Sequence, residues 1–233
     1  MTNPIQTVTG SWNGGATTVA VTFSTLPTAG DSAIIVVNIY SPGATVVSSI
    51  ADNQGVGNSY VSVAGVTEPA LNQRIEMWWC KTLGATSGTF TATVTLSGSN
   101  NALARAIECS GLTAVDLATT ATTGATATTL VATQSGANSN ANDFVVAGVA
   151  LQYTGSGNPL ISTPTTGYTQ LSYDSGFTGY VGSEVAYKNV SVIETDSATW
   201  TWTGSLNAGA IVASFKAGGG GGGGGGCPVA WLT

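Results

Sequence analysis

Three glutamates on apolar, strand-like segments are the residues best suited to catalysis in this chain: Glu76, Glu108 and Glu184. Two carboxyl groups at a set separation, one of them with a raised pKa, would be the machinery of a glycoside hydrolase. Nothing in the sequence shows that these three converge, and nearby basic residues favour cross-strand ion pairs instead. The chain has no histidine, which removes Ser-His-Asp and Cys-His catalysis and histidine-ligated zinc. We therefore expect a protein that is not an enzyme and that has no cofactor.

Four tryptophans form two close pairs, Trp78 with Trp79 and Trp200 with Trp202. Exposed indole rings could stack on the C–H faces of sugars. Trp200 and Trp202 share one face of a strand, opposite threonines, which is typical of a sandwich core. Because adjacent residues of a strand point to opposite faces, only one of Trp78 and Trp79 can fill a given core. Either could therefore be a glycan contact.

Asp52-Asn53-Gln54-Gly55 offers oxygen ligands in a turn, as calcium sites do. It is also an ordinary turn sequence and lacks the carboxylate density of calcium loops, so we expect a turn and no metal site. The three cysteines, Cys80, Cys109 and Cys227, have no metal-ligand spacing. Cys80 and Cys109 lie in apolar segments, which favours buried thiols, although a disulfide between them stays open. Cys227 could link chains.

Apolar residues alternate with a period of two through most of the chain. In residues 89–96 one face is Phe, Ala, Val and Leu and the other is all threonine, and residues 198–203 repeat this pattern with tryptophan. This is the pattern of half-buried strands, with β-branched threonine on the solvent face. No segment shows a helical pattern, so we predict an all-β, antiparallel β-sandwich. Further strand candidates are 17–23, 33–40, 59–63, 74–81, 102–109, 130–133, 144–153, 168–173, 181–188 and 208–215.

The two halves of the sequence resemble each other weakly. The corresponding segments are 31–37 with 142–148, 76–81 with 184–188, 91–98 with 197–204, and 102–107 with 208–213. A repeat of this kind predicts either two stacked lobes or one sandwich in which equivalent strands face each other. We favour one sandwich domain over residues 1–217, because residues 116–136 are too rich in Ala and Thr to be a clear linker.

Charged residues make up only 7% of the chain, and the net charge is -6. The five basic residues are scattered, which argues against nucleic acid and anionic membranes as partners. No apolar run approaches the ~18 residues of a membrane span, so we expect no membrane insertion. The first residues lack the basic and apolar regions of a secretory signal, which predicts synthesis in a cytoplasm.

Several short motifs together resemble a known structural module. They are 50–55, 58–60, 74–81, 106–112, 142–146 and 213–216, and the similarity spans roughly residues 17 to 216. The module is a jelly-roll-type β-sandwich of bacteriophage structural proteins and bacterial surface proteins. Cys109 stands where the pattern would have an aromatic residue. The resemblance implies virion structure, attachment or glycan contact, and it supplies no catalytic set.

The chain ends with nine consecutive glycines, Gly218 to Gly226, and a short apolar peptide. We call residues 218–233 the tail. A glycine tract can be a flexible linker, or an extended segment that packs closely against other chains. We favour the second interpretation, with the apolar peptide as the anchor in a pocket. The expected docking residues are Gly218, Gly222, Gly226, Cys227, Pro228, Val229, Trp231 and Leu232.

These observations predict a non-enzymatic virion protein on the particle surface, made in the host cytoplasm. It would be a capsid-decoration, head-fibre or tail-associated protein, docked through the tail to other capsid or tail proteins, and a homo-oligomer. The alternative is a glycan- or receptor-binding module of a phage appendage or bacterial surface, with a cell-surface glycan as its partner.

Overall fold

The computed structural model describes residues 4–9, 14–40, 43–70, 73–84, 87–152, 161–162, 164, 167–174 and 182–218. Within these ranges the chain forms strands and turns and no helix, which confirms the all-β prediction. The strands are β1 (Pro4–Thr9), β2 (Thr18–Thr22), β3 (Ser32–Tyr40), β4 (Val47–Asp52), β5 (Tyr60–Thr67), β6 (Gln73–Cys80), β7 (Thr91–Leu96), β8 (Asn101–Cys109), β9 (Leu112–Thr122), β10 (Ala127–Thr133), β11 (Phe144–Leu151), β12 (Thr169–Asp174), β13 (Gly182–Asn189), β14 (Ser197–Leu206) and β15 (Ala208–Ala217).

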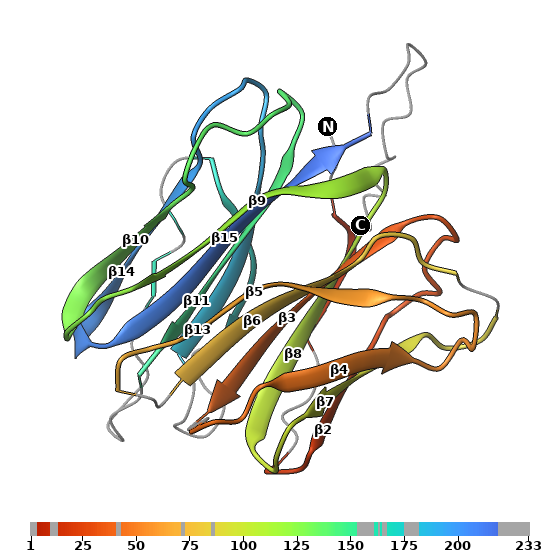
Figure 1. Cartoon of the computed structure of the whole chain (residues 1–233), viewed down its shortest axis with the longest axis horizontal. Coiled ribbons are helices and arrows are strands. Elements are labelled where there is room, and N and C mark those ends of the chain that lie inside the picture. The colour runs from red at the N-terminus through yellow and green to blue at the C-terminus, as the bar shows by residue number, and fades with distance from the viewer. Residues whose placement is uncertain are drawn as a thin grey trace, which may run out of the picture.

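Four antiparallel sheets form successive layers (Figure 1). The first central sheet has the order β1-β8-β3-β6-β5, and the second has the order β12-β13-β11-β15-β9. These two sheets pack face to face. A small sheet, β2-β7-β4, covers the outer face of the first, and the pair β10-β14 covers the outer face of the second.

Three apolar clusters fill the spaces between the layers. The first, which contains Phe23, Phe90 and Val94, lies between the β2-β7-β4 sheet and the first central sheet. The second lies between the two central sheets and includes Met77 and Phe215. The third lies between the second central sheet and the β10-β14 sheet. Both central sheets are therefore buried on both faces, which is why β3 and β11 are apolar almost throughout.

The alternating segments fold as their patterns predict. In β7 the apolar residues are buried and the threonines between them are partly exposed. Trp200 is fully buried and Trp202 is 5% exposed, so both are core residues of the third cluster. Cys80 and Cys109 are buried free thiols, as expected.

The layering has features of both arrangements that the sequence repeat allowed. The central sheets of the two halves face each other, as in one sandwich. Each half also has a core of its own beneath its small sheet, as in two lobes. Strands β1 to β8 supply the first central sheet and the sheet that covers it, and strands β9 to β15 supply the other two.

Candidate functional site

The three glutamates singled out by the sequence lie apart. Glu76 pairs with Val37 and Glu108 with Ala33 on either side of β3, four residue positions or about 13 Å along that strand. Glu184 belongs to β13 of the other central sheet. The fold therefore does not bring these carboxyl groups together as an acid–base pair.

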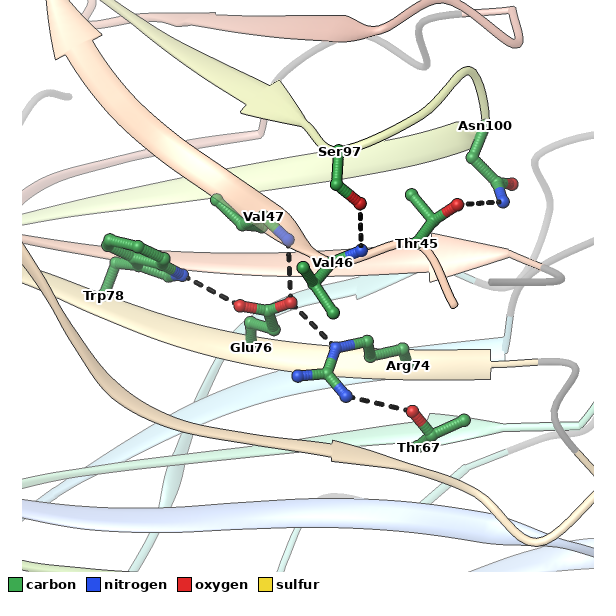
Figure 2. Close-up of polar contacts among 9 residues, drawn as sticks. All are labelled: Thr45, Val46, Val47, Thr67, Arg74, Glu76, Trp78, Ser97 and Asn100. Atoms are coloured by element: carbon green, nitrogen blue, oxygen red, sulfur yellow. Dashed lines mark hydrogen bonds and ion pairs between the residues drawn. The ribbon is translucent and has the colours of Figure 1, made fainter. Parts of the chain in front are cut away.

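Glu76 is a buried carboxylate that ties β6 to the covering strand β4 (Figure 2). Its Oε1 accepts the Val47 backbone N–H at 2.9 Å and the Arg74 Nε–H at 2.7 Å, while Oε2 accepts the Trp78 indole N–H at 3.1 Å. Arg74 in turn donates to the Thr67 hydroxyl on β5 at 3.0 Å. With three donors around it, this carboxylate is held in one position and serves to fix strands.

Trp79 is a buried residue and Trp78 is partly buried. Trp79 is 7% exposed and packs between the central sheets, with its ring centroid 5.9 Å from that of Phe215. Trp78 points to the other side of β6, is half-buried against the first cluster, and donates to Glu76. The tryptophans that sequence reasoning selected as glycan contacts are thus engaged with the protein itself.

Asp52 sits in a turn whose polar groups bind one another. Its Oδ1 accepts the Gln54 backbone N–H at 3.0 Å, and its Oδ2 accepts the Asn58 amide at 2.8 Å and the Tyr60 hydroxyl at 3.0 Å. The carboxylate is therefore committed to the turn and to β5. In the part of the chain that the structure describes, no group of three or more His, Cys, Asp or Glu side chains could hold a metal ion.

A pair of carboxyl groups that the sequence reasoning missed lies where β3 begins. Asp31, 8% exposed, is next to Glu108 at the end of β8. Burial, together with a hydrogen bond and charge repulsion from Glu108, raises the pKa of Asp31 to about 6. Glu108 also accepts the Gln6 amide and the Thr28 backbone N–H, so it holds the edge strand β1 and the end of the loop after β2. Below about pH 6 the protonated Asp31 carboxyl can donate to Glu108 and relieve the charge repulsion between them.

A second carboxyl pair occupies the corresponding place where β11 begins. Burial and contact with Asp116 raise the pKa of Asp143, which is fully buried, to about 6. For Asp116 itself burial acts upward, but hydrogen bonds from the Ser139 backbone and hydroxyl, from Asp143 and from Lys216 outweigh it and lower the pKa. Lys216 Nζ lies 3.2 Å from Asp116 Oδ1.

Both carboxyl pairs lie at the end of the molecule where the described chain enters and leaves the sheets. Pro4 at the start of β1 pairs with Cys109, and Ala217 at the end of β15 pairs with Leu112, so both flank the turn between β8 and β9. We call this end the terminal pole. Here the Gly218 backbone N–H donates to the Gly111 carbonyl at 2.5 Å.

Lys188 on β13 makes a polar cluster of its own. Its Nζ lies 2.6 Å from Glu194 Oε1 and 2.9 Å from Asp196 Oδ1, and 6.0 Å from the centre of the Tyr168 ring. Burial would lower the pKa of Lys188, but its two carboxylate partners prevail and raise it. The cluster fastens the turn between β13 and β14, and the sequence offers no local signal for it.

Arg105 joins the two central sheets. It is 2% exposed on β8, and its guanidinium donates to Asn38 Oδ1 at 3.0 Å and, across the layer, to Ser183 Oγ at 2.8 Å. A small open hollow beside it is lined by Thr7, Val8, Ala106, Ile107, Leu171 and Val185.

Of the predicted docking residues, only Gly218 is described. Gly222, Gly226, Cys227, Pro228, Val229, Trp231 and Leu232 lie outside the described residues. In the described part no helix is long and apolar enough to cross a membrane. No family model, curated protein or solved structure was found to match the chain.

Proposed function

We propose that this chain is a non-enzymatic structural protein of a bacteriophage particle, in the class of capsid-decoration, head-fibre or tail-associated proteins. In this proposal the layered β body lies on the virion surface and the tail, residues 218–233, docks it to other virion proteins. The resemblance of the strand motifs to phage jelly-roll modules supports it, together with the antiparallel layered sheets.

The observation that carries the proposal is the way the tail begins. Gly218 is bonded to Gly111, and a Cβ atom built on Gly218 would lie 3.2 Å from the Gly111 oxygen and 3.3 Å from Thr113 Cγ2. The first glycine of the tract is therefore already in close backbone contact, which only a residue without a side chain makes easily. This contact is with the same chain; in the proposal, later glycines make close backbone contacts with partner chains and carry the apolar peptide to its pocket.

We further propose that the body consists of two jelly rolls that arose by duplication. The orders β1-β8-β3-β6-β5 and β9-β15-β11-β13-β12 place corresponding strands at corresponding positions. In a jelly roll of eight strands, one sheet has the order 1-8-3-6, and the first central sheet contains it as β1-β8-β3-β6. The second half has seven described strands, and β9-β15-β11-β13 matches the same order when the place of the β4 counterpart is left empty. The covering strands also correspond, because β2 pairs with β7 as β10 pairs with β14.

Details of the strand pairing support the duplication. The bulge in β5 between Ser62 and Ala64 has a counterpart in β12 between Gln170 and Ser172. The backbone bond from Leu83 N–H to the Asp31 carbonyl matches that from Val190 N–H to the Asp143 carbonyl. Bulges and such turn bonds are specific features that unrelated strands would not share by chance.

Truncation tests the docking role directly. A chain that ends at Gly218 keeps every described strand, so its circular dichroism spectrum and melting temperature should match those of the full chain. In particles isolated from cells that carry the gene, the full chain should co-sediment with the particles, and the truncated chain should stay in the supernatant. Normal incorporation of the folded, truncated chain would overturn the proposal.

Oligomeric state provides a second readout of the same variant. If the tail packs against other copies, light scattering after size exclusion should give a higher mass for the full chain than for the chain ending at Gly218. Equal, monomeric masses at about 100 µM, well above the dissociation constant of a stable interface, would remove the homo-oligomer from the proposal. The evidence for docking to other virion proteins would then be the co-sedimentation result alone.

A further inference from the structure

The two outer faces of the molecule carry regular arrays of hydroxyl groups. On the first covering sheet, neighbouring strands align Thr18 with Thr95 and Thr22 with Thr91, and Ser49 of β4 lies beside Thr95. On the other, Thr129 aligns with Thr201 and Thr133 with Ser197. Hydroxyl-bearing positions recur about 4.8 Å apart across the strands and about 6.7 Å apart along them. We call these the first and second hydroxyl faces.

The outward residues are better preserved between the two halves than the core residues beneath them. Four of six outward positions are identical, in the pairs Thr18/Thr129, Thr22/Thr133, Thr93/Thr199 and Thr95/Thr201, while Ala20/Val131 and Thr91/Ser197 differ. Of five inward positions on the same strands only Ala92/Ala198 is identical, and Val19/Leu130, Val21/Ala132, Val94/Trp200 and Leu96/Trp202 differ. The comparison uses the residue pairing that the proposed duplication implies.

This is the reverse of what folding alone would produce. Substitutions at exposed strand positions usually change stability little, whereas core substitutions are costly, so surfaces diverge faster than cores. Threonine suits an exposed strand position but is not required there, since Val131, 49% exposed, occupies one of the six outward positions. The hydroxyl groups shared by the two halves therefore indicate that both faces contact a binding partner.

The chemistry of the faces limits that partner. Strands β2, β7, β10 and β14 contain no charged residue, and Asp52, the one acid of β4, is hydrogen-bonded to Gln54, Asn58 and Tyr60. The outward positions therefore offer no charge to a nucleic acid, an acidic glycan or a charged protein surface. Three strands of five residues, as in the first face, span roughly 14 Å by 17 Å, or about 240 Å², and the two-stranded second face spans less. A stable protein complex needs about 800 Å² per partner with aromatic or arginine anchors, which these faces lack.

Hydroxyl groups that can both donate and accept, interleaved with methyl groups, complement a neutral sugar chain, which also presents O–H and C–H groups. Some of these hydroxyls already form hydrogen-bonded pairs, Thr22 with Thr91 and Thr133 with Ser197, each at 2.9 Å, and either oxygen of a pair can be the donor. We infer that the two hydroxyl faces bind uncharged polysaccharide. Each face binds weakly, and because the faces lie on opposite sides of the layers, one molecule bridges two chains.

Affinity electrophoresis tests this inference, with hydroxyethylcellulose, mannan and amylopectin as separate probes in native gels. The full chain should be retarded by at least one probe. Thr93→Glu and Thr199→Glu, each at the centre of one face, should reduce the retardation about twofold, and the double variant should abolish it. Thr120→Glu on β9 is exposed but on neither face, and it adds the same charge. Relative to its mobility in a gel without polysaccharide, this control should be retarded as much as the parent.

Melting temperatures of all variants establish that they are folded. The chain ending at Gly218 should bind as the full chain does, so failure of tail docking and failure of this inference are distinguishable. No retardation by any probe, or undiminished retardation of the double variant, would overturn the inference. Concentration-dependent dimerisation lost in the double variant would also overturn it, since the faces would then bind a second copy.

Discussion

The two carboxyl pairs at the terminal pole predict that the protein is more stable in mild acid than at neutral pH. Asp31 and Asp143 each have a pKa raised from an ordinary 3.8 to about 6 in the folded state. The protonated form is therefore favoured by folding. The resulting stabilisation is complete below pH 3.8 and is lost as the pH rises through about 6.

The magnitude follows from the two pKa values. Between pH 5 and pH 7.5, a shift from 3.8 to about 6 corresponds to about 1.4 kcal/mol per group. Two groups give about 3 kcal/mol as an upper value, and screening by water at the strand ends reduces this to roughly 1.5 kcal/mol. The lowered pKa of Asp116 acts in the opposite direction but only in stronger acid, below this window.

Asp31→Asn and Asp143→Asn imitate the protonated acids at every pH, because an amide can donate to Glu108 or Asp116 as a protonated carboxyl does. Urea denaturation at pH 5.0 and pH 7.5 should show the parent losing about 1.5 kcal/mol at the higher pH. Each single variant should lose about half as much and the double variant almost nothing. Equal stability of the parent at both pH values, or an unchanged loss in the double variant, would refute the reasoning.

Two further substitutions test the packing. Glu76→Gln leaves three donors around a side chain with one acceptor oxygen, so we expect a loss of about 2 kcal/mol in urea denaturation, and a loss below ~0.5 kcal/mol would contradict the role of Glu76. Gly148→Ala places a Cβ atom 2.8 Å from Ile75 Cδ1 between the central sheets and should cost about 1–3 kcal/mol. Adding Ile75→Val removes that atom and should recover part of the loss; strictly additive losses would argue against the clash.

Local pattern was enough to predict most strands and the direction of their side chains. The segments around Phe90 and Trp200 alternate, and a period of two places one set of residues on the core. β1, β4 and β9 were not among the predicted strands, because they are edge strands without strong alternation. The Ala- and Thr-rich composition of β9 concealed it further.

The polar sites could not be predicted in the same way, because each joins residues from distant strands. Asp31 meets Glu108, and Asp143 meets Asp116, only once the order of the strands in the sheets is known. One signal was present: Asp31 and Asp143 each immediately precede the apolar strand of one of the repeated segments. Two acids that immediately precede equivalent strands indicate a shared role.

The terminal pole has a practical consequence for anyone who attaches a reporter to this protein. Because Pro4 and Ala217 both adjoin the turn between β8 and β9, a fluorescent protein or bead fused ahead of β1 would stand beside the start of the tail. A reporter there would crowd whatever the tail touches. The turn between β9 and β10, around Gly124, is an exposed site at the far end of β9, and a label placed there would report on the protein while leaving the tail unobstructed.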